Sequence, residues 1–463
     1  MNPIVPLIMA VALFMEQMDS TVISTALPAI AADLNVGPIT LKLALTTYMV
    51  ALAIFIPVSG WTADRFGAKR VFRAAIVVFL IGSVFCAVSS NLIEFVASRF
   101  LQGMGGAMMT PVGRLVILRT TNRSELVRAM ALLTIPALIG PMAGPPLGGF
   151  LTTYFSWHWI FLINVPIGIV GLIMAGIFLP LIEDEPPSNL DWKGFFLVAL
   201  AASGIVFGLS VISLPALPPA TGFITTAIGF LSGIWYIRHA RRVERPLLNL
   251  SLFSNASFAV ATSAATFFRM ATGAFPFLMP LMLQLGFGLN PFESGMITFV
   301  GAAGALLTKF VAPKVFSAFG FRTVLITASL GAAILTVTFA FFEATTPHIV
   351  ILAILFTSGL FRSFFFTGVN ALAYADIENS QASQATAMSS MFQQASFALG
   401  VAFAAVILEL AGHFTGGELT VAHFHIAFAV VALLSLVSVF PLLRLRRDAG
   451  AAVSGHKAPQ AAE

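Results

Sequence analysis

Two carboxylates, Glu16 and Asp19, lie inside the first long apolar stretch of the chain, which runs from Ile4 to Ile30. If this stretch crosses a bilayer as a helix, a rise of about 1.5 Å per residue places both groups near the middle of the hydrocarbon. An ionisable group at that depth is costly unless it is paired, hydrated or protonated. The i, i+3 spacing puts both on one helix face, where two like charges do not both ionise freely. The pair therefore has the chemistry of a proton-carrying site.

The composition excludes a soluble fold. Of the 463 residues, 58% are hydrophobic and 9% are charged, and the mean hydropathy is +0.96, whereas soluble domains carry roughly 25% charged residues. The single cysteine, Cys86, excludes an intrachain disulfide and a cysteine-based metal cluster, and we expect no cofactor. The net charge of +5 arises from short basic loops, so we expect no nucleic-acid partner. The N-terminus lacks the basic start of a cleavable signal peptide.

Apolar segments of spanning length recur about fourteen times along the chain, often interrupted by Pro and Gly. They lie at roughly 4–30, 39–61, 71–90, 93–117, 127–153, 158–181, 191–213, 219–237, 256–284, 293–318, 322–344, 347–371, 383–411 and 422–443. We therefore predict an all-α polytopic membrane protein with about fourteen transmembrane helices.

The Lys and Arg residues that lie in loops occur in alternate loops. With the N-terminus in the cytoplasm, the inside loops hold basic clusters such as 64–73, 238–245 and 443–447, and the predicted outside loops hold no Lys or Arg. This asymmetry predicts a multi-pass protein of the bacterial inner membrane with both termini in the cytoplasm.

A short internal repeat divides the chain. The segment FGAKRV at 66–71 recurs as FGFRTV at 319–324. We predict an N-terminal six-helix half (1–182), two linking helices with their loops (183–250), a C-terminal six-helix half (251–445) and a disordered cytoplasmic tail (446–463). Repeated halves are typical of secondary transporters, whose substrate site lies between the halves.

Several segments resemble motifs of the major facilitator superfamily, in the right order and topological position. GWTADRFGAKR (60–70) resembles its cytoplasmic-loop signature, SRFLQGMGGAMM (98–109) its fourth-helix segment, and GPMAGPPLGG (140–149) the motif of its antiporters. MDSTVISTALPAI (18–30) and SWHWIFLINVPIGI (156–169) resemble segments of its fourteen-helix drug:proton antiporter family. The resemblance implies the major facilitator fold, no enzyme activity, and proton-driven export of a small amphipathic or cationic compound by alternating access.

By this resemblance, Asp19 is the proton-coupling carboxylate and Arg99 takes part in proton transfer. We expect Arg99 to pair with Asp19 or Glu16, and Gln102 to share this network or to face the substrate cavity. The alternative is a structural ion pair with no coupling role. Glu16 lies upstream of the motif, so three roles stay open: it tunes the ionisation of Asp19, selects a cation, or bonds across a helix interface.

The loop motif predicts a conformational latch. Gly60 and Gly67 permit tight turns and close helix approach. Asp64 is expected to accept from a neighbouring helix N-terminus or to pair with Arg65 or Arg70. The alternative is a solvated loop that only sets topology.

The antiporter-like motif places Gly140, Gly144, Gly148 and Gly149 on or near one helix face, with Pro145 beside them. Small residues at this spacing let another helix pack closely, and prolines bend the helix. By resemblance, the tight interface restricts leak and so sets the direction of transport. The alternative is generic small-residue packing.

In the second half, Arg269 is the main buried cation predicted, and we expect it to line the central substrate cavity. Arg362 and Lys309 are expected nearer the cytoplasmic side, where they snorkel or pair. Aromatic cavity walls would suit a lipophilic cation. The chain has no phosphate-binding loop signature, so ATP-driven transport is not expected.

Two alternatives stay open. An exporter of a specific metabolite or siderophore with the same fold would use Arg269 and Arg99 to hold an acidic substrate. A membrane sensor that transports nothing would need a soluble signalling domain, and the longest polar segment is the short C-terminal tail. The expected partners are the lipid bilayer, protons and a small-molecule substrate, with a periplasmic adaptor protein as a further candidate.

Overall fold

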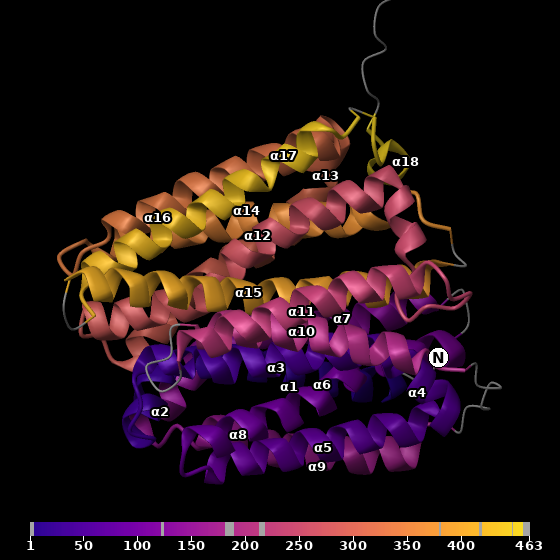
Figure 1. The fold of residues 1–463 in the computed structure, drawn as a ribbon, viewed down its shortest axis with the longest axis horizontal. Coiled ribbons are helices and arrows are strands. Elements are labelled where there is room, and N and C mark those ends of the chain that lie inside the picture. The colour runs from indigo at the N-terminus through magenta and orange to yellow at the C-terminus, as the bar shows by residue number, and fades with distance from the viewer. Residues whose placement is uncertain are drawn as a thin grey trace, which may run out of the picture. The chain divides into compact units, whose positions relative to one another are not determined.

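The computed structural model describes residues 4–121, 125–180, 189–212, 218–378, 381–415, 419–446 and 448–456, and these residues form helices and no strand (Figure 1). The chain divides into two compact units. The first contains Met1–Leu247 and Leu289–Met296, and the second contains Leu248–Gly288 and Ile297–Glu463. The all-helical prediction is confirmed.

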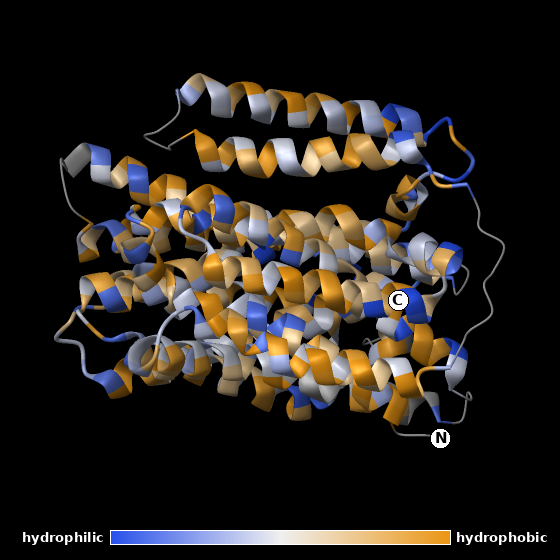
Figure 2. Ribbon diagram, turned by 90° about the horizontal axis from the view of Figure 1, so that it is seen from below, coloured by the Kyte–Doolittle hydropathy of each residue, from blue (hydrophilic) through white to orange (hydrophobic). Residues whose placement is uncertain are grey.

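The described residues contain eleven helical stretches that are long and apolar enough to cross a membrane. One of them, Pro291–Phe341, holds two predicted spans, because the backbone leaves the helical conformation at Gly320. Two further 29-residue helices, α6 (Leu92–Thr120) and α7 (Leu126–Tyr154), match the predicted spans 93–117 and 127–153. The eleven stretches, the second span within Pro291–Phe341, and α6 and α7 together account for the fourteen predicted spans. Figure 2 shows hydrophobic residues along the helices.

The first unit contains the helices of the N-terminal half and the two linking helices. Besides α6 and α7 these are α1 (Ile4–Val22), α2 (Leu27–Asp33), α3 (Lys42–Phe55), α4 (Ser59–Phe66), α5 (Ala68–Val88), α8 (Trp159–Leu162), α9 (Asn164–Phe178), α10 (Trp192–Val211) and α11 (Pro219–Ala240). The linking helices α10 and α11 pack against each other, and α10 also packs on α3 through Val211 and Leu43.

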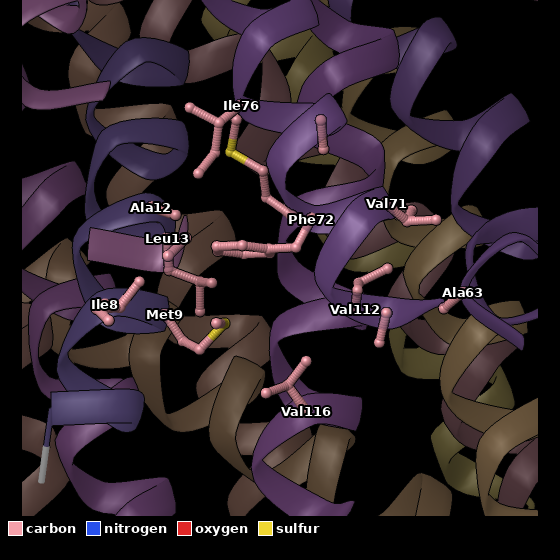
Figure 3. Close-up of a cluster of buried hydrophobic side chains, with 14 of the residues drawn as sticks. Ile8, Met9, Ala12, Leu13, Ala63, Val71, Phe72, Ile76, Val112 and Val116 are labelled. Atoms are coloured by element: carbon pink, nitrogen blue, oxygen red, sulfur yellow. The ribbon is translucent and has the colours of Figure 1, made fainter. Parts of the chain in front are cut away.

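A cluster of apolar side chains joins α1, α5 and α6 (Figure 3). Met9 and Leu13 of α1 lie beside Phe72 of α5, and Val112 and Val116 of α6 complete this part of the cluster. In lipid, close packing rather than exclusion of water is what stabilises such contacts. The cluster fixes the rotation of α1, and therefore the direction in which the carboxylates further along that helix point.

Asp191 joins the two linking helices at one end. Its side chain accepts from the N–H of Gly194, at 2.8 Å, and so caps the start of α10. His239 Nε2, near the end of α11, lies 2.7 Å from Asp191 Oδ1, and the N–H of Leu247 donates to Oδ2. Burial alone raises the pKa of Asp191, but the hydrogen bonds from His239, Gly194 and Leu247 outweigh it and hold the pKa below its usual value.

The second unit contains the helices of the C-terminal half. They are α12 (Ala256–Leu281), α13 (Pro291–Thr338, of which Pro291–Met296 belongs to the first unit), α14 (His348–Tyr374), α15 (Ala382–Thr415), α16 (Val421–Val437), α17 (Val439–Leu443) and α18 (Ala451–Ser454). The short helix α18 lies in the predicted tail, where His456 Nδ1 is 3.0 Å from the carbonyl oxygen of Ser317. Residues 457–463 lie outside the described residues.

The repeated sequence segment has a matching backbone in each unit. Gly67 separates α4 from α5 with φ 83°, and Gly320 interrupts α13 with φ 71°. Both angles lie in the region that favours glycine over other residues. The repeat is therefore a helix–corner–helix element present once in each unit.

Candidate functional site

Asp19 lies at the centre of a buried hydrogen-bond network. Arg99 Nη1 donates to its Oδ2 at 2.7 Å, and Gln102 Nε2 and Asn164 Nδ2 donate to its Oδ1 at 2.7 and 2.9 Å. All four side chains belong to residues with 0% exposure. Gln102 Nε2 also donates to Ser83 Oγ at 2.8 Å. Both oxygens of Asp19 therefore accept hydrogen bonds, and one of the donors is the charged guanidinium of Arg99.

Four helices supply this network. Asp19 comes from α1, Arg99 and Gln102 from successive turns of α6, Ser83 from α5 and Asn164 from the first residue of α9. The close approach of α5 and α6 needs a glycine, because a Cβ atom on Gly82 would lie 2.6 Å from the backbone of Gln102. Small-residue contacts of this kind let polar side chains on neighbouring membrane helices reach each other.

The Arg99 guanidinium packs against two aromatic rings, and two of its nitrogen atoms have no hydrogen-bond partner among the described residues. Its Cζ lies 4.3 Å from the ring centroid of Tyr48 and 5.7 Å from that of Phe161, within the range of a cation–π contact. Nη1 also donates to Gln102 Oε1 at 2.5 Å. Nε and Nη2 are buried and have no hydrogen-bond partner among the described residues. Arg99 is thus charge-balanced by Asp19 and retains N–H groups that can bond elsewhere.

Glu16 is buried but lies outside the Asp19 network. Its Oε2 accepts from Thr110 Oγ1, two turns beyond Gln102 on α6, at 2.5 Å. Of the two partners expected for Arg99, the structure therefore selects Asp19. The two carboxylates have separate surroundings, and a basic side chain bonds Asp19 but not Glu16 within the described residues.

Sequence reasoning did not identify Asn164, Ser83 or Thr110 as part of these surroundings. Asn164 is the most visible signal, because it is a polar side chain inside the apolar run IFLINVPIGI. Ser83 and Thr110 resemble many other small hydroxyl residues in spanning helices, so only their position against Asp19 and Glu16 sets them apart.

Within the described residues, the loop motif at 60–70 makes an ion pair across helices. Asp64 Oδ1 accepts from Arg119 Nη2, near the end of α6, at 2.9 Å. The expected partners Arg65 and Arg70 are exposed instead and do not bond Asp64. The close helix approach expected at Gly60 is absent, because a Cβ atom there would meet nothing within 4 Å among the described residues.

The glycines of the α7 motif face close neighbours. A Cβ atom on Gly140 would lie 3.0 Å from Phe14 O, and one on Gly144 would overlap Thr21 of α1. Gly148 faces Val22, the last residue of α1, and Thr25 of the short helix that follows it. Thr25 Oγ1 lies 3.5 Å from the carbonyl oxygen of Pro145, and Gly149 faces Pro291 and Phe292 of the same unit. The predicted small-residue interface therefore lies chiefly between α7 and the helix that carries Asp19.

In the second unit, Arg269 of α12 is buried and 4% exposed. Its Nη2 donates to Asn370 Oδ1 of α14 at 2.8 Å, and its Nε has no partner among the described residues. Arg362, expected to snorkel or pair, instead lies over the rings of Phe275 and Phe339, with Cζ 4.2 and 5.8 Å from their centroids. Lys309 Nζ donates to Thr367 Oγ1 at 2.7 Å.

Known proteins resemble the chain along most of its length. A family model of the Major Facilitator Superfamily matches residues 9–267 and 261–461. A putative multidrug resistance protein MdtD from Pectobacterium atrosepticum is 38% identical over 403 residues, which cover 87% of this chain and 86% of the relative. Its counterpart from Enterobacter sp. strain 638 is 34% identical over 440 residues, which cover 95% of this chain and 93% of the relative.

Solved structures share the fold. The peptide transporter PepTSo aligns with a TM-score of 0.70 at 13% identity, over 96% of this chain and 97% of that chain. A D-xylose–proton symporter aligns with a TM-score of 0.69 at 14% identity, over 96% of this chain and 98% of that chain. At these identities the likeness concerns the fold alone. With the family match along nearly all of its length, this chain belongs to the Major Facilitator Superfamily and is a transporter rather than an enzyme.

Proposed function

We propose that the protein is a proton-coupled antiporter of the bacterial inner membrane that exports small amphipathic or cationic compounds by alternating access. The carrying observation is the buried carboxylate of Asp19, held by Arg99, Gln102 and Asn164. The MdtD relatives are described as putative multidrug resistance proteins, which supports export of small foreign compounds.

In this mechanism, Asp19 carries the proton. Protonation removes its charge, so that Arg99 loses its counter-ion and must find other acceptors for its N–H groups. Two of these groups, Nε and Nη2, are already without a partner among the described residues. The hydrogen bonds between α1 and α6 would then differ between the two protonation states of Asp19. Coupling of proton binding to a conformational change requires such a difference.

Other sites support the cycle. Glu16, bonded by Thr110, is a second carboxylate that influences the ionisation of Asp19 from one helical turn away. The Asp64–Arg119 pair acts as the latch, and the α7 glycine interface holds α1 closely enough to restrict leak. The basic loops orient both termini toward the cytoplasm. Protons move down their gradient across the membrane, from outside to inside. A periplasmic adaptor remains a candidate partner.

Proton flux in reconstituted liposomes tests this proposal. Compounds of different charge are added to vesicles with an imposed pH gradient, and an internal dye reports proton movement. We expect substrate-dependent flux in the wild type and in Glu343→Gln, whose carboxyl group lies in an exposed loop, and none in Asp19→Asn. Full flux in Asp19→Asn would contradict the assignment of the proton carrier.

Export of an acidic metabolite or siderophore is the second candidate. One observation favours it: the buried guanidinium of Arg269 keeps an unpartnered Nε and has no carboxylate beside it among the described residues. The charge of the substrate separates this candidate from export of a cationic compound.

A further inference from the structure

Two cations in the membrane helices of the second unit lack an anionic partner. Arg269 lies near the middle of the 26-residue helix α12, and Arg362 near the middle of the 27-residue helix α14. Among the described residues, neither forms an ion pair, and Arg362 forms no hydrogen bond. An uncompensated guanidinium at this depth is costly and marks a functional position.

The positive charge of the buried Arg99 guanidinium is balanced by a carboxylate of the protein itself. It has the carboxylate of Asp19 at 2.7 Å and the ring of Tyr48 beneath it. Arg269 has a single amide oxygen, from Asn370, and Arg362 has only ring faces. Both therefore lack the element that Arg99 has, which is a negative charge.

The two arginines lie along one helix pair. Arg269 of α12 bonds Asn370 of α14, and Arg362 of α14 lies over Phe275 of α12. Arg269 precedes Phe275 along α12, whereas its partner Asn370 follows Arg362 along α14, as expected for antiparallel helices. Both guanidinium groups therefore lie in the α12–α14 contact. Phe366, one turn after Arg362, lies with its ring centroid 5.9 Å from the Cζ of Arg269. The ring of Phe366 therefore lies beside Arg269, on the stretch of α14 between Arg362 and Asn370.

Guanidinium groups with aromatic rings beside them suit a ligand that has both an anionic group and an apolar body. A planar guanidinium binds a carboxylate or a similar oxyanion through two parallel N–H donors. The surrounding phenylalanines offer flat apolar faces to an aromatic or lipophilic body. An anion of this kind bound at Arg269 would supply a negative charge that this helix pair lacks among the described residues.

We propose that the α12–α14 contact binds amphipathic organic anions, whose anionic group is held by Arg269 and Asn370, while Arg362, about 12 Å away along α14, adds positive charge. This inference rests on the proposed transport function and specifies its substrate class. Within it, Asp19 and Arg99 are reserved for the proton, and the second unit selects the charge of the substrate.

Three probes with one ring system test the inference: 1-naphthoate, 1-naphthamide and 1-naphthylmethylammonium. Their binding to the protein in lipid nanodiscs is measured by equilibrium dialysis at neutral pH, without a pH gradient. We expect the wild type to bind the naphthoate more tightly than the other two. Arg269→Gln should weaken naphthoate binding by roughly tenfold to a hundredfold, the effect of losing a charge-assisted hydrogen bond. Arg362→Gln should weaken it by less, and neither variant should change binding of the amide much.

Two variants serve as controls. Arg269→Lys keeps the charge and should recover part of the naphthoate affinity, and Arg446→Gln, whose side chain is 84% exposed, should leave it unchanged. Equal binding of the three probes by the wild type, no naphthoate binding, or an undiminished affinity in Arg269→Gln would overturn the inference. Proton coupling plays no part in this measurement. A wild-type preference for naphthoate in a protein without proton flux would refute the antiport proposal alone.

Discussion

Arg99 Nη1 lies 2.7 Å from Asp19 Oδ2, and the two residues are separated by 80 positions in the sequence. Both are fully buried, and the amides of Gln102 and Asn164 complete the coordination of the carboxylate. The pair joins the first helix of the chain to α6 through the strongest kind of polar contact available inside a membrane. Loss of the Asp19–Arg99 pair should therefore lower the stability of the protein and the coupling of proton movement to transport.

Removing one member of the Asp19–Arg99 pair should destabilise the protein. Arg99→Leu leaves the carboxylate of Asp19 buried without its counter-ion, which typically costs about 3–5 kcal/mol. Adding Asp19→Asn to this variant should recover much of the stability, because no charge is then left unpaired. Thermal unfolding in detergent measures the effect, and Arg446→Gln is the exposed control. A single variant as stable as the wild type would show that the pair is not a buried charge pair.

Gly144→Ala should weaken the contact between α7 and α1. The new Cβ atom would lie 2.9 Å from Thr21 Cβ and 3.1 Å from Val22 N, so the helices must separate. We expect a loss of about 1–3 kcal/mol and slower transport. Gly60→Ala is the matched control, because its Cβ would meet nothing within 4 Å. Equal effects of the two substitutions would contradict a specific role for the α7 interface.

Asp64→Asn should lower the transport rate while changing the stability little. Its ion pair with Arg119 is partly exposed, at 33% and 20% of the two side chains, and such pairs contribute at most about 1 kcal/mol. A latch acts by biasing one conformer, so its loss should appear in the rate of uphill transport by liposomes. Unchanged transport would support the alternative of a solvated loop that only sets topology.

Asp191 should make the free energy of unfolding decrease as the pH falls into the acidic range. Because its pKa is lowered in the folded protein, the stability that it contributes is present above the ordinary carboxyl pKa of about 3.9 and is lost as the pH falls through the lowered value. Asp191→Asn can still cap α10 but cannot ionise. The difference in Tm between wild type and this variant should be larger at pH 7 than at pH 3. A difference that grows toward low pH would have the wrong sign.

Most of the fold could be predicted from the sequence because lipid imposes simple rules on it. A spanning helix needs a long apolar run, and the basic residues mark alternate loops, so the span count follows directly. The break inside α13 followed from the repeat of Gly67 as Gly320. Asp19, Arg99 and Gln102 could be grouped because the family-like segments point to them.

The remaining parts of the site depend on the rotation and depth of each helix, which the sequence pattern leaves open. Asn164 reaches Asp19 from 145 positions away, and Thr110 rather than Arg99 bonds Glu16. Arg119 replaced the nearer arginines as the partner of Asp64 because α6 ends beside α4. Local spacing describes neighbours on one helix, and these contacts are all between helices.

The most direct measurement compares uphill transport with exchange in Asp19→Asn. In liposomes, proton-driven export and substrate exchange at equal pH are recorded for the same compound in wild type and variant. If Asp19 is the proton carrier, Asp19→Asn loses uphill export driven by the pH gradient and keeps exchange, because the variant resembles the protonated state permanently. Uphill export that persists in Asp19→Asn and still collapses when the gradient is removed would contradict the account, because another group would then carry the proton.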